Sequence, residues 1–426
     1  MKLTEDDLYR SSTQFTHWSF TLQQLAAQRQ KTNLQATERV KANVARQRAQ
    51  RAQQAENGSA SEGVESGSGA NTPNAVTSDR DVDCLTVAEE MTIVDEFCER
   101  AVQLGAHCQF PIEVTATCIQ FLRRFYLFNS PMTYHGQNIS RTAMFLACKT
   151  ENSHQSVENF AGNFKKVTAE QILAPEYLIV QALRFNFEIK HPFRGLKGGH
   201  LELMEMARGN YDGPNHSAGD GGDGNTTSAD TQSAMLSLPR KVNGPVSRMT
   251  VKDMEERITA AYGFASHILK NAALLTDAYF LYTPAQLWLS AHLLADEPLT
   301  IFYLSLKLPR SSPLYAKLLS TIRACASLLS SHRSFTAGTL PKEEKDARDV
   351  KHKAHVKSLI EKLKMCRDPD KVDLVKLNQA QKRDAIQGET LDENKAKRRK
   401  LERESYEKEA DAFWGPELSQ QEPKLG

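Results

Sequence analysis

Two oppositely charged residues at the ends of apolar helical segments are the strongest candidates for chemistry in this sequence. Lys149 follows the apolar run 143–148, and Glu176 begins a further apolar segment that extends to Phe187. An apolar surface that carries one fixed cation and one fixed anion suits the binding of another protein's helix. It does not suit cutting or joining a substrate. We therefore expect a protein-binding surface and no catalytic residues.

The segments that must position this pair have the periodicity of helices. A stripe of apolar residues recurs at helical spacing before Asn129: Val114, Cys118, Phe121, Leu122 and Phe125. The helix expected from about 138 to 149 is apolar nearly all round, which is typical of a helix in the middle of a bundle. Pro175 interrupts the next helical pattern. The helix should therefore kink or restart there and leave Glu176 near an exposed turn.

Capping boxes mark the starts of several helices. In this motif a Thr side chain and a Glu or Gln three residues later satisfy backbone N–H groups at the helix start. The pattern occurs at Thr21, Thr86, Thr168 and Thr283, and Pro284 supplies a proline at the first helical position. No segment alternates apolar and polar residues with turns at strand spacing. The fold class is therefore predicted to be all-α.

Composition divides the chain into four parts. Residues 1–84 comprise an aromatic segment, a helix to about residue 54 and a disordered linker. Residues 85–190 form a first helical repeat, and residues 191–335 form a second repeat with the same order of long, central, short and long helices. In the second repeat we expect a long helix from Val251 to Leu281 and a disordered insertion at 209–247. Residues 336–426 form a charged C-terminal helix and tail.

Charge and cysteine content exclude several classes of protein. The chain has 426 residues and a net charge of +2, from 54 basic and 52 acidic residues, so it shows no bias toward nucleic acid. Its seven cysteines form no Cys-x-x-Cys pair, which favours reduced thiols in an intracellular protein. The acidic start is unlike a signal peptide, and no uncharged apolar run reaches the roughly 20 residues that span a bilayer. His352 and His355 share a helix face but lack further ligands, so we expect no metal. We also expect no cofactor and no membrane contact.

Three motifs carry a resemblance to a known family. They are Phe-Tyr-Leu-Phe-Asn-Ser-Pro at 125–131, Phe-Leu-Ala-Cys-Lys-Thr-Glu at 145–151, and the segment 170–187 that contains Glu176. On these residues the chain resembles the cyclins, and within that family it is most similar to the cyclin H group. The segments 11–20 and 275–286 look like the leader and the second repeat of that group.

The resemblance implies two consecutive five-helix cyclin-box repeats with flanking N- and C-terminal helices and disordered linkers. It also implies a non-catalytic regulatory subunit that binds and activates a cyclin-dependent kinase. In the cyclin H group this kinase belongs to the CDK-activating kinase complex, a module of transcription factor IIH that phosphorylates the RNA polymerase II C-terminal domain. The implied partners are the kinase, a RING-finger assembly factor and, indirectly, other transcription factor IIH subunits, and the implied location is the nucleus.

The resemblance also assigns roles to individual residues. In cyclins a lysine on the central helix and a glutamate on the fifth helix hydrogen-bond the main chain at the kinase's regulatory helix, and Lys149 and Glu176 occupy those places. The positions that supply the surrounding apolar contact are Thr150, Val180, Phe185 and Phe187. Two departures from the cell-cycle cyclins point to the transcriptional cyclins. The segment 91–95 lacks their Arg-containing docking patch, and Arg123 replaces an Asp on the second helix.

Other interpretations stay open at this point. The chain is alternatively another transcriptional cyclin, a core transcription factor with two cyclin repeats that binds DNA and polymerase, or an unrelated helical scaffold. Core factors of that kind usually carry a zinc ribbon with paired Cys-x-x-Cys motifs, which this sequence lacks. The basic run 395–400 is either a nuclear import signal or a solvated charge run. The G-x-G-x-x-G match at 219–224 is rejected because no strand precedes it.

Overall fold

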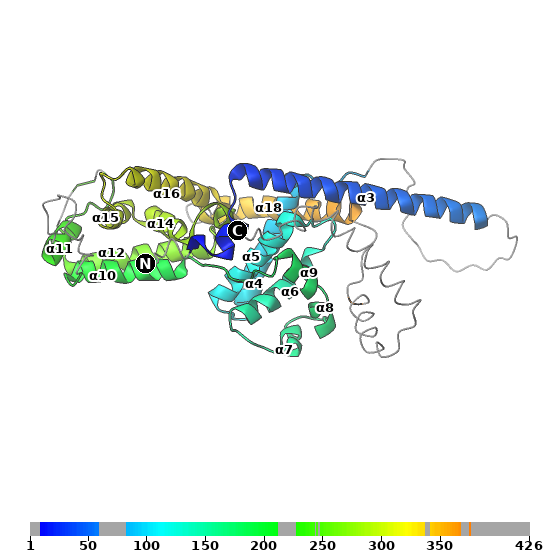
Figure 1. Cartoon of the computed structure of the whole chain (residues 1–426), viewed down its shortest axis with the longest axis horizontal. Helices are drawn as coiled ribbons and strands as arrows, with labels where there is room; N and C mark the ends of the chain where they lie inside the picture. Colours follow the sequence, from blue (N-terminus) through cyan, green and yellow to red (C-terminus); the bar gives the residue numbers. More distant parts are fainter. Residues whose placement is uncertain are drawn as a thin grey trace, which may run out of the picture. The chain divides into compact units, whose positions relative to one another are not determined.

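The computed structural model describes residues 9–58, 82–211, 227–242, 244–245, 248–336, 341–367 and 375. Throughout these residues the regular structure is helical and contains no strand, which confirms the all-α prediction (Figure 1). The helices belong to the first of two compact units, Met1–Lys371. Among the described residues no helix is both long and apolar enough to cross a membrane. Residues 59–80 of the linker predicted at 56–80, residues 212–226 of the insertion predicted at 209–247, and the basic run 395–400 lie outside the described residues.

The first bundle is built around one apolar helix. It contains α4 (Val87–His107), α5 (Ile112–Phe128), α6 (Gly136–Thr150), α7 (Val157–Gly162), α8 (Ala169–Leu173) and α9 (Glu176–Ala182). Helix α6 packs against α4, α5, α8 and α9, and residues 142–148 are all buried. Helix α6 is apolar around most of its circumference, which explains why it needs neighbours on every side.

The second bundle repeats this plan around α14. It contains α10 (Phe193–Arg208), α11 (Ser228–Leu236), α12 (Val251–Lys270), α13 (Ala278–Leu281), α14 (Pro284–Ala295), α15 (Glu297–Lys307), α16 (Pro313–Ser331) and α17 (Arg333–Thr336). Helix α14 packs against α10, α12, α15 and α16. Trp288 of α14 lies against α10 at Gly195 and Gly199, where a built Cβ would meet its ring at 2.6 and 2.9 Å. The two glycines therefore let α10 approach the buried indole.

The predicted helix starts are confirmed by hydrogen bonds. Complete capping boxes open α4 at Thr86, α8 at Thr168 and α14 at Thr283. Thr21 and Gln24 exchange the same two bonds before α3 (Leu22–Gly58). The restart at Pro175 is also confirmed, because α8 ends at Leu173 and α9 begins at Glu176.

Two expectations for the second bundle are wrong. The stretch 209–247 was expected to be disordered, but α11 forms within it because Thr227 and Asp230 supply a capping box and Met235 is buried. The long helix expected to reach Leu281 ends at Lys270. The chain turns after Asn271, and the carbonyl of Leu274, released from a helix, accepts a hydrogen bond from another bundle.

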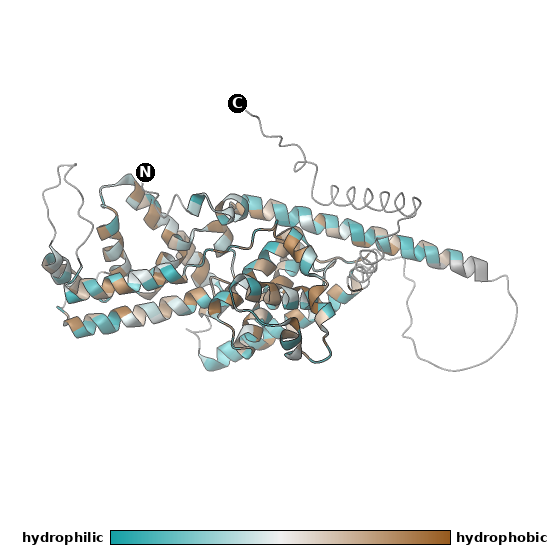
Figure 2. Cartoon of the chain, turned by 60° about the horizontal axis from the view of Figure 1, so that its bottom comes forward, coloured by the Kyte–Doolittle hydropathy of each residue, from teal (hydrophilic) through white to brown (hydrophobic). Residues whose placement is uncertain are grey.

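The N-terminal segment packs on both bundles. Helix α2 (Thr13–Trp18) ends at Trp18, which is 0% exposed and forms one apolar cluster with Leu25, Leu127 and Phe280. Phe20 donates its backbone N–H to the carbonyl of Phe280 at 2.8 Å. Hydrophilic residues predominate along α3 (Figure 2). The helix therefore depends on the contact of its few apolar residues with the bundles for its stability.

A buried ionic junction accompanies this apolar cluster. Arg123 of α5 donates to the Leu274 carbonyl at 2.9 Å and to Asp95 at 2.7 Å, and its other terminal nitrogen lies 3.4 Å from Asp277. Arg29 of α3 adds two bonds to Asp277, at 2.8 and 2.6 Å. Burial would raise the pKa of Asp277, but the hydrogen bond from Arg29 and the charge of Arg123 outweigh it and lower the pKa. The junction thus joins α3, the first bundle and the second bundle.

A C-terminal helix, α18 (Lys342–Met365), packs on α4. Val356, Leu359 and Leu363 are buried there, and Lys362 lies 3.1 Å from Asp83 and 3.0 Å from Glu89. The charged C-terminal segment predicted from sequence therefore contributes one apolar face to the first bundle.

We predict that Arg123→Met lowers the free energy of unfolding by about 3 kcal/mol, because it removes a buried cation that pairs with Asp277, whose side chain is 17% exposed, and with Asp95, whose side chain is 35% exposed. Denaturant titration of the whole chain measures the effect. The control is Arg100→Met, since Arg100 pairs with Glu96 on the surface at 2.7 Å. It should cost less than about 1 kcal/mol. Equal losses in the two variants would contradict a special role for the junction.

The centre of the second bundle contains a histidine that should make stability depend on pH. Burial lowers the pKa of His292 to about 4, against a smaller opposing effect of Asp296. Its Nδ1 lies 2.7 Å from the hydroxyl of Thr300. The folded chain therefore keeps this imidazole neutral at a pH where the unfolded chain has already bound a proton.

The free energy of unfolding should thus fall as the pH drops, with His292 contributing a loss of about 2 kcal/mol between pH 7 and pH 5. The His292→Gln variant should show a correspondingly flatter decline on the acid side. Urea titrations at several pH values measure both curves. Parallel curves for the two proteins would show that His292 carries none of the dependence.

Candidate functional site

The structure brings Lys149 and Glu176 together as an ion pair. Lys149 lies in the last turn of α6, and Glu176 lies in the first turn of α9. The C-terminal end of a helix favours a cation and the N-terminal end favours an anion, so both helix dipoles support this arrangement. Pro175 ends the preceding turn and places the start of α9 beside the end of α6.

The pair faces solvent. The side chain of Lys149 is 40% exposed and that of Glu176 is 24% exposed. The ammonium also lies 4.7 Å from the centre of the Phe145 ring, which holds it over an aromatic face. An exposed ion pair of this kind stabilises a fold by only about 0–1 kcal/mol. Both groups are therefore held at defined positions, and separating them to bind another partner costs little free energy.

The four apolar positions predicted for this surface differ in exposure. Thr150 is half-buried and its hydroxyl donates to the carbonyl of Ala147 at 3.1 Å. Val180 is half-buried on α9, four residues after Glu176 and thus on the same face. Phe187 is half-buried and packs edge-on against Phe121 of α5, with ring centres 6.3 Å apart. Phe187 is therefore in part a core residue.

Phe185 is the exposed member of the set. It follows α9 and is 60% exposed, and its backbone N–H donates to the carbonyl of Val180 at 3.0 Å. Arg184 and Phe185 have φ values of 53° and 57°, in the left-handed region that most residues avoid. The pattern of the sequence contains no signal for this conformation.

Tyr177 is a further surface residue that sequence reasoning missed. It is 64% exposed and directly follows Glu176 on α9. A large aromatic side chain beside an accessible ion pair offers apolar area to a partner. The available signal was its place next to Glu176, off the three-residue spacing of the buried Ile179 and Ala182.

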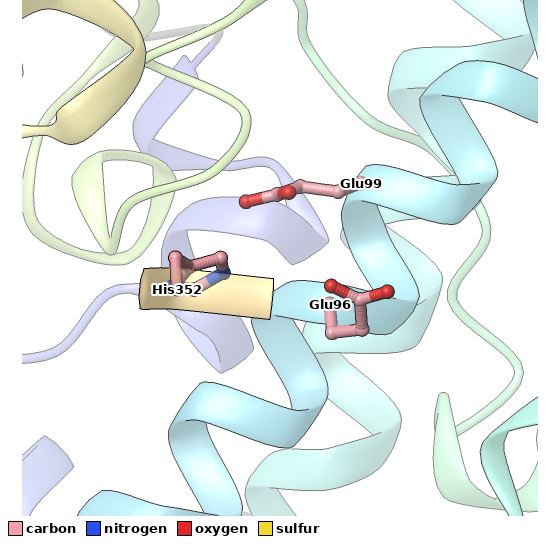
Figure 3. A group of neighbouring side chains, drawn as sticks. All are labelled: Glu96, Glu99 and His352. Atoms are coloured by element: carbon pink, nitrogen blue, oxygen red, sulfur yellow. The ribbon is translucent and has the colours of Figure 1, made fainter. Parts of the chain in front are cut away.

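A second charged group lies between α4 and α18. Ligand atoms of Glu96, Glu99 and His352 lie within 4.8 Å of one another, and their side chains lie close together between the two helices (Figure 3). Arg100 pairs with Glu96, and Arg333 pairs with Glu99. Each carboxylate thus already has a cationic partner. This favours the interpretation that the group is an electrostatic contact that holds α18 against α4, rather than a metal centre.

Two family models match the two bundles. Residues 95–188 match the cyclin N-terminal domain, and residues 191–330 match the cyclin C-terminal domain. The chain belongs to the cyclin family. The expected pair of cyclin repeats is therefore confirmed, with α6 and α14 as their central helices.

Individual relatives agree with this assignment. The cyclin is 30% identical to cyclin CCL1 of Saccharomyces cerevisiae over 308 residues, which are 72% of this chain and 63% of that protein. It is 32% identical to cyclin mcs2 of Schizosaccharomyces pombe over 200 residues, 47% of this chain and 56% of the relative. The chain thus spans less than two thirds of the length of these two relatives. A chain in the structure of the CAK complex from Chaetomium thermophilum bound to ATP-γ-S superposes with a TM-score of 0.64 at 30% identity, covering 92% of this chain and 98% of that one.

The different exposures of the two phenylalanines lead to a prediction. Phe187→Ala should lower the free energy of unfolding by about 2 kcal/mol, because it removes a ring that packs on Phe121. Phe185→Ala should change it by less than about 0.5 kcal/mol, because the ring is largely in solvent. Thermal or urea unfolding of the two variants makes the comparison. A larger loss for Phe185→Ala would mean that this ring is a core residue.

Proposed function

We propose that this cyclin is the regulatory subunit of a cyclin-dependent kinase, of the cyclin H type found in the CDK-activating kinase and transcription factor IIH module. The observation that carries the proposal is the solvent-facing Lys149–Glu176 pair at the meeting point of α6 and α9. The likeness to cyclin CCL1, to cyclin mcs2 and to a chain of the CAK complex supports this type of cyclin over others.

The pair binds the main chain at the kinase's regulatory helix. Lys149 donates hydrogen bonds to carbonyl oxygens, and Glu176 accepts them from backbone N–H groups. Each charge-assisted bond is worth about 1.5–3 kcal/mol, whereas opening the exposed pair costs at most about 1 kcal/mol. Exchange of partners is therefore favourable. Val180 and Thr150 flank the pair, and Phe185 and Phe187 continue the contact beyond α9.

Binding activates the kinase by a change of population. The cyclin contributes no reacting group, and docking selects the position of the regulatory helix in which the kinase completes its Lys–Glu ion pair. The cyclin is rigid where this matters, because residues 142–148 of α6, directly before Lys149, are all buried within the first bundle. A rigid surface imposes one position on a mobile helix.

The same assignment extends to the other partners. We propose that a RING-finger assembly factor completes the complex, that other transcription factor IIH subunits associate indirectly, and that the complex acts in the nucleus on the RNA polymerase II C-terminal domain. The cyclin itself makes no direct contact with nucleic acid, in keeping with its net charge of +2.

The double variant Lys149→Ala, Glu176→Ala tests the proposal. It should weaken binding of the co-expressed kinase by roughly a hundredfold or more, because two charge-assisted bonds are lost. It should change the free energy of unfolding by less than about 1 kcal/mol, because the pair is exposed. Affinity is measured with purified proteins, and activation is measured by phosphate transfer to a polymerase C-terminal domain peptide.

A matched control removes an equivalent ion pair elsewhere. Arg323 and Glu297 lie 2.9 Å apart on the surface of the second bundle, with side chains that are 56% and 34% exposed. Replacing both with Ala should leave kinase binding unchanged. Full stimulation of the kinase by the Lys149/Glu176 double variant would count decisively against the proposed contact.

A further inference from the structure

The loop that follows α9 is attached to the N-terminal segment by two separate contacts. The backbone N–H of Lys190 donates to the buried side-chain oxygen of Gln14 at 2.6 Å. The guanidinium carbon of Arg184 lies 5.7 Å from the centre of the Trp18 ring. Residues 184–190 are thus held by α2, which precedes both repeats in the sequence.

Trp18 contacts a second arginine that also reaches this loop. The guanidinium carbon of Arg124 lies 4.7 Å from the Trp18 ring, and a terminal nitrogen of Arg124 lies 3.4 Å from the carbonyl oxygen of Asn186. Arg184 additionally lies 5.0 Å from the ring of Phe128. Attraction between guanidinium groups and aromatic faces strengthens when the groups are withdrawn from water, as Trp18 and Arg124 are here.

These contacts coincide with backbone strain. Arg184 and Phe185 are consecutive non-glycine residues at positive φ, a conformation that persists only where the surroundings enforce it. Three short-range bonds close the turn: Arg184 N–H to Gln181, Phe185 N–H to Val180 and Asn186 N–H to Leu183, at 2.8, 3.0 and 3.0 Å. The side chain of one strained residue is held against Trp18, and that of the other is exposed.

We infer that the contact between Trp18 and Arg184 positions Phe185 for the kinase, so that α2 controls the partner surface through this loop. Arg184 and Trp18 are positioning residues, and Phe185 is the contacting residue. This inference rests on the proposed function for its consequence in binding. The conformation of the loop itself is a property of the isolated chain.

The decisive variant is Arg184→Met, which keeps the length of the side chain and removes the cation. Hydrogen exchange of the amides of residues 184–186 in the isolated full chain should accelerate about tenfold, and kinase affinity should fall about tenfold. Arg184→Lys should retain part of the protection and of the affinity, because it restores a cation. Arg323→Met is the matched control on the second bundle and should change neither quantity.

Two further variants separate the contact from its alternatives. Arg184→Gly relieves the strain without restoring the contact, so wild-type exchange and affinity in this variant would overturn the inference. Trp18→Leu should accelerate the same amides if the chain remains folded by circular dichroism. Unchanged exchange in Arg184→Met also overturns the inference. Failure of the wild-type cyclin to bind the kinase would instead refute the proposed function, and the exchange data would still decide whether Arg184 positions the loop.

Discussion

The buried contact of Arg123 and Arg29 with Asp277 is the interaction on which the arrangement of the two repeats depends. Apolar packing alone has no direction, and Trp18, Leu25, Leu127 and Phe280 would tolerate small shifts between the bundles. Charged groups withdrawn from water do not tolerate such shifts, because each lost hydrogen bond leaves an uncompensated charge. The ionic junction therefore fixes the relative position of the two bundles, which the apolar cluster alone would not fix.

Helix α5 connects this junction to the partner surface through adjacent residues. Arg123 points to the second bundle, and Arg124 points to Trp18 and to the loop after α9. Successive residues of a helix project about 100° apart, so one helix serves both contacts without bending. Trp18 also takes part in both, since it belongs to the apolar cluster beside the ionic junction and contacts Arg124 and Arg184. The contacts that join the repeats and the contacts that hold the loop containing Phe185 thus share Trp18 and neighbouring residues of α5.

Local chemistry accounts for the parts of this structure that could be predicted from sequence. The capping boxes at Thr86, Thr168 and Thr283 specify helix starts through bonds within four residues. The apolar circumference of α6 likewise requires a central place, whatever its neighbours are. Pairing of Lys149 with Glu176 was not predictable, because it depends on how the ends of α6 and α9 meet in space. Their exposure and closeness leave them available to a partner.

The missed helix α11 has a local signal, the capping box of Thr227 and Asp230, whereas the other differences have tertiary causes. The helix after Val251 ends at Lys270, and the carbonyl of Leu274 beyond it is stabilised by a distant residue, Arg123, rather than by a helical hydrogen bond. Helix α10 is hard to predict because glycine is a poor helix former, yet Gly195 and Gly199 are needed to admit Trp288. The left-handed residues Arg184 and Phe185 likewise depend on distant contacts. In each case a propensity worth about 1 kcal/mol per residue yields to packing.

In the proposed contact with the kinase, the energies of the ion pair and of the aromatic residues can be compared. The Lys149–Glu176 pair loses its internal contact when it binds a partner, so its net contribution is smaller than its gross hydrogen bonding. Full burial of a large apolar side chain is worth about 1.5–3 kcal/mol, and binding pays part of this back in lost side-chain freedom. Tyr177 and Phe185, both mostly exposed, can therefore each add affinity comparable to that of one charge-assisted hydrogen bond. In the proposed contact the ion pair adds direction as well as affinity, since hydrogen bonds to main-chain donors and acceptors depend on geometry and apolar contact does not.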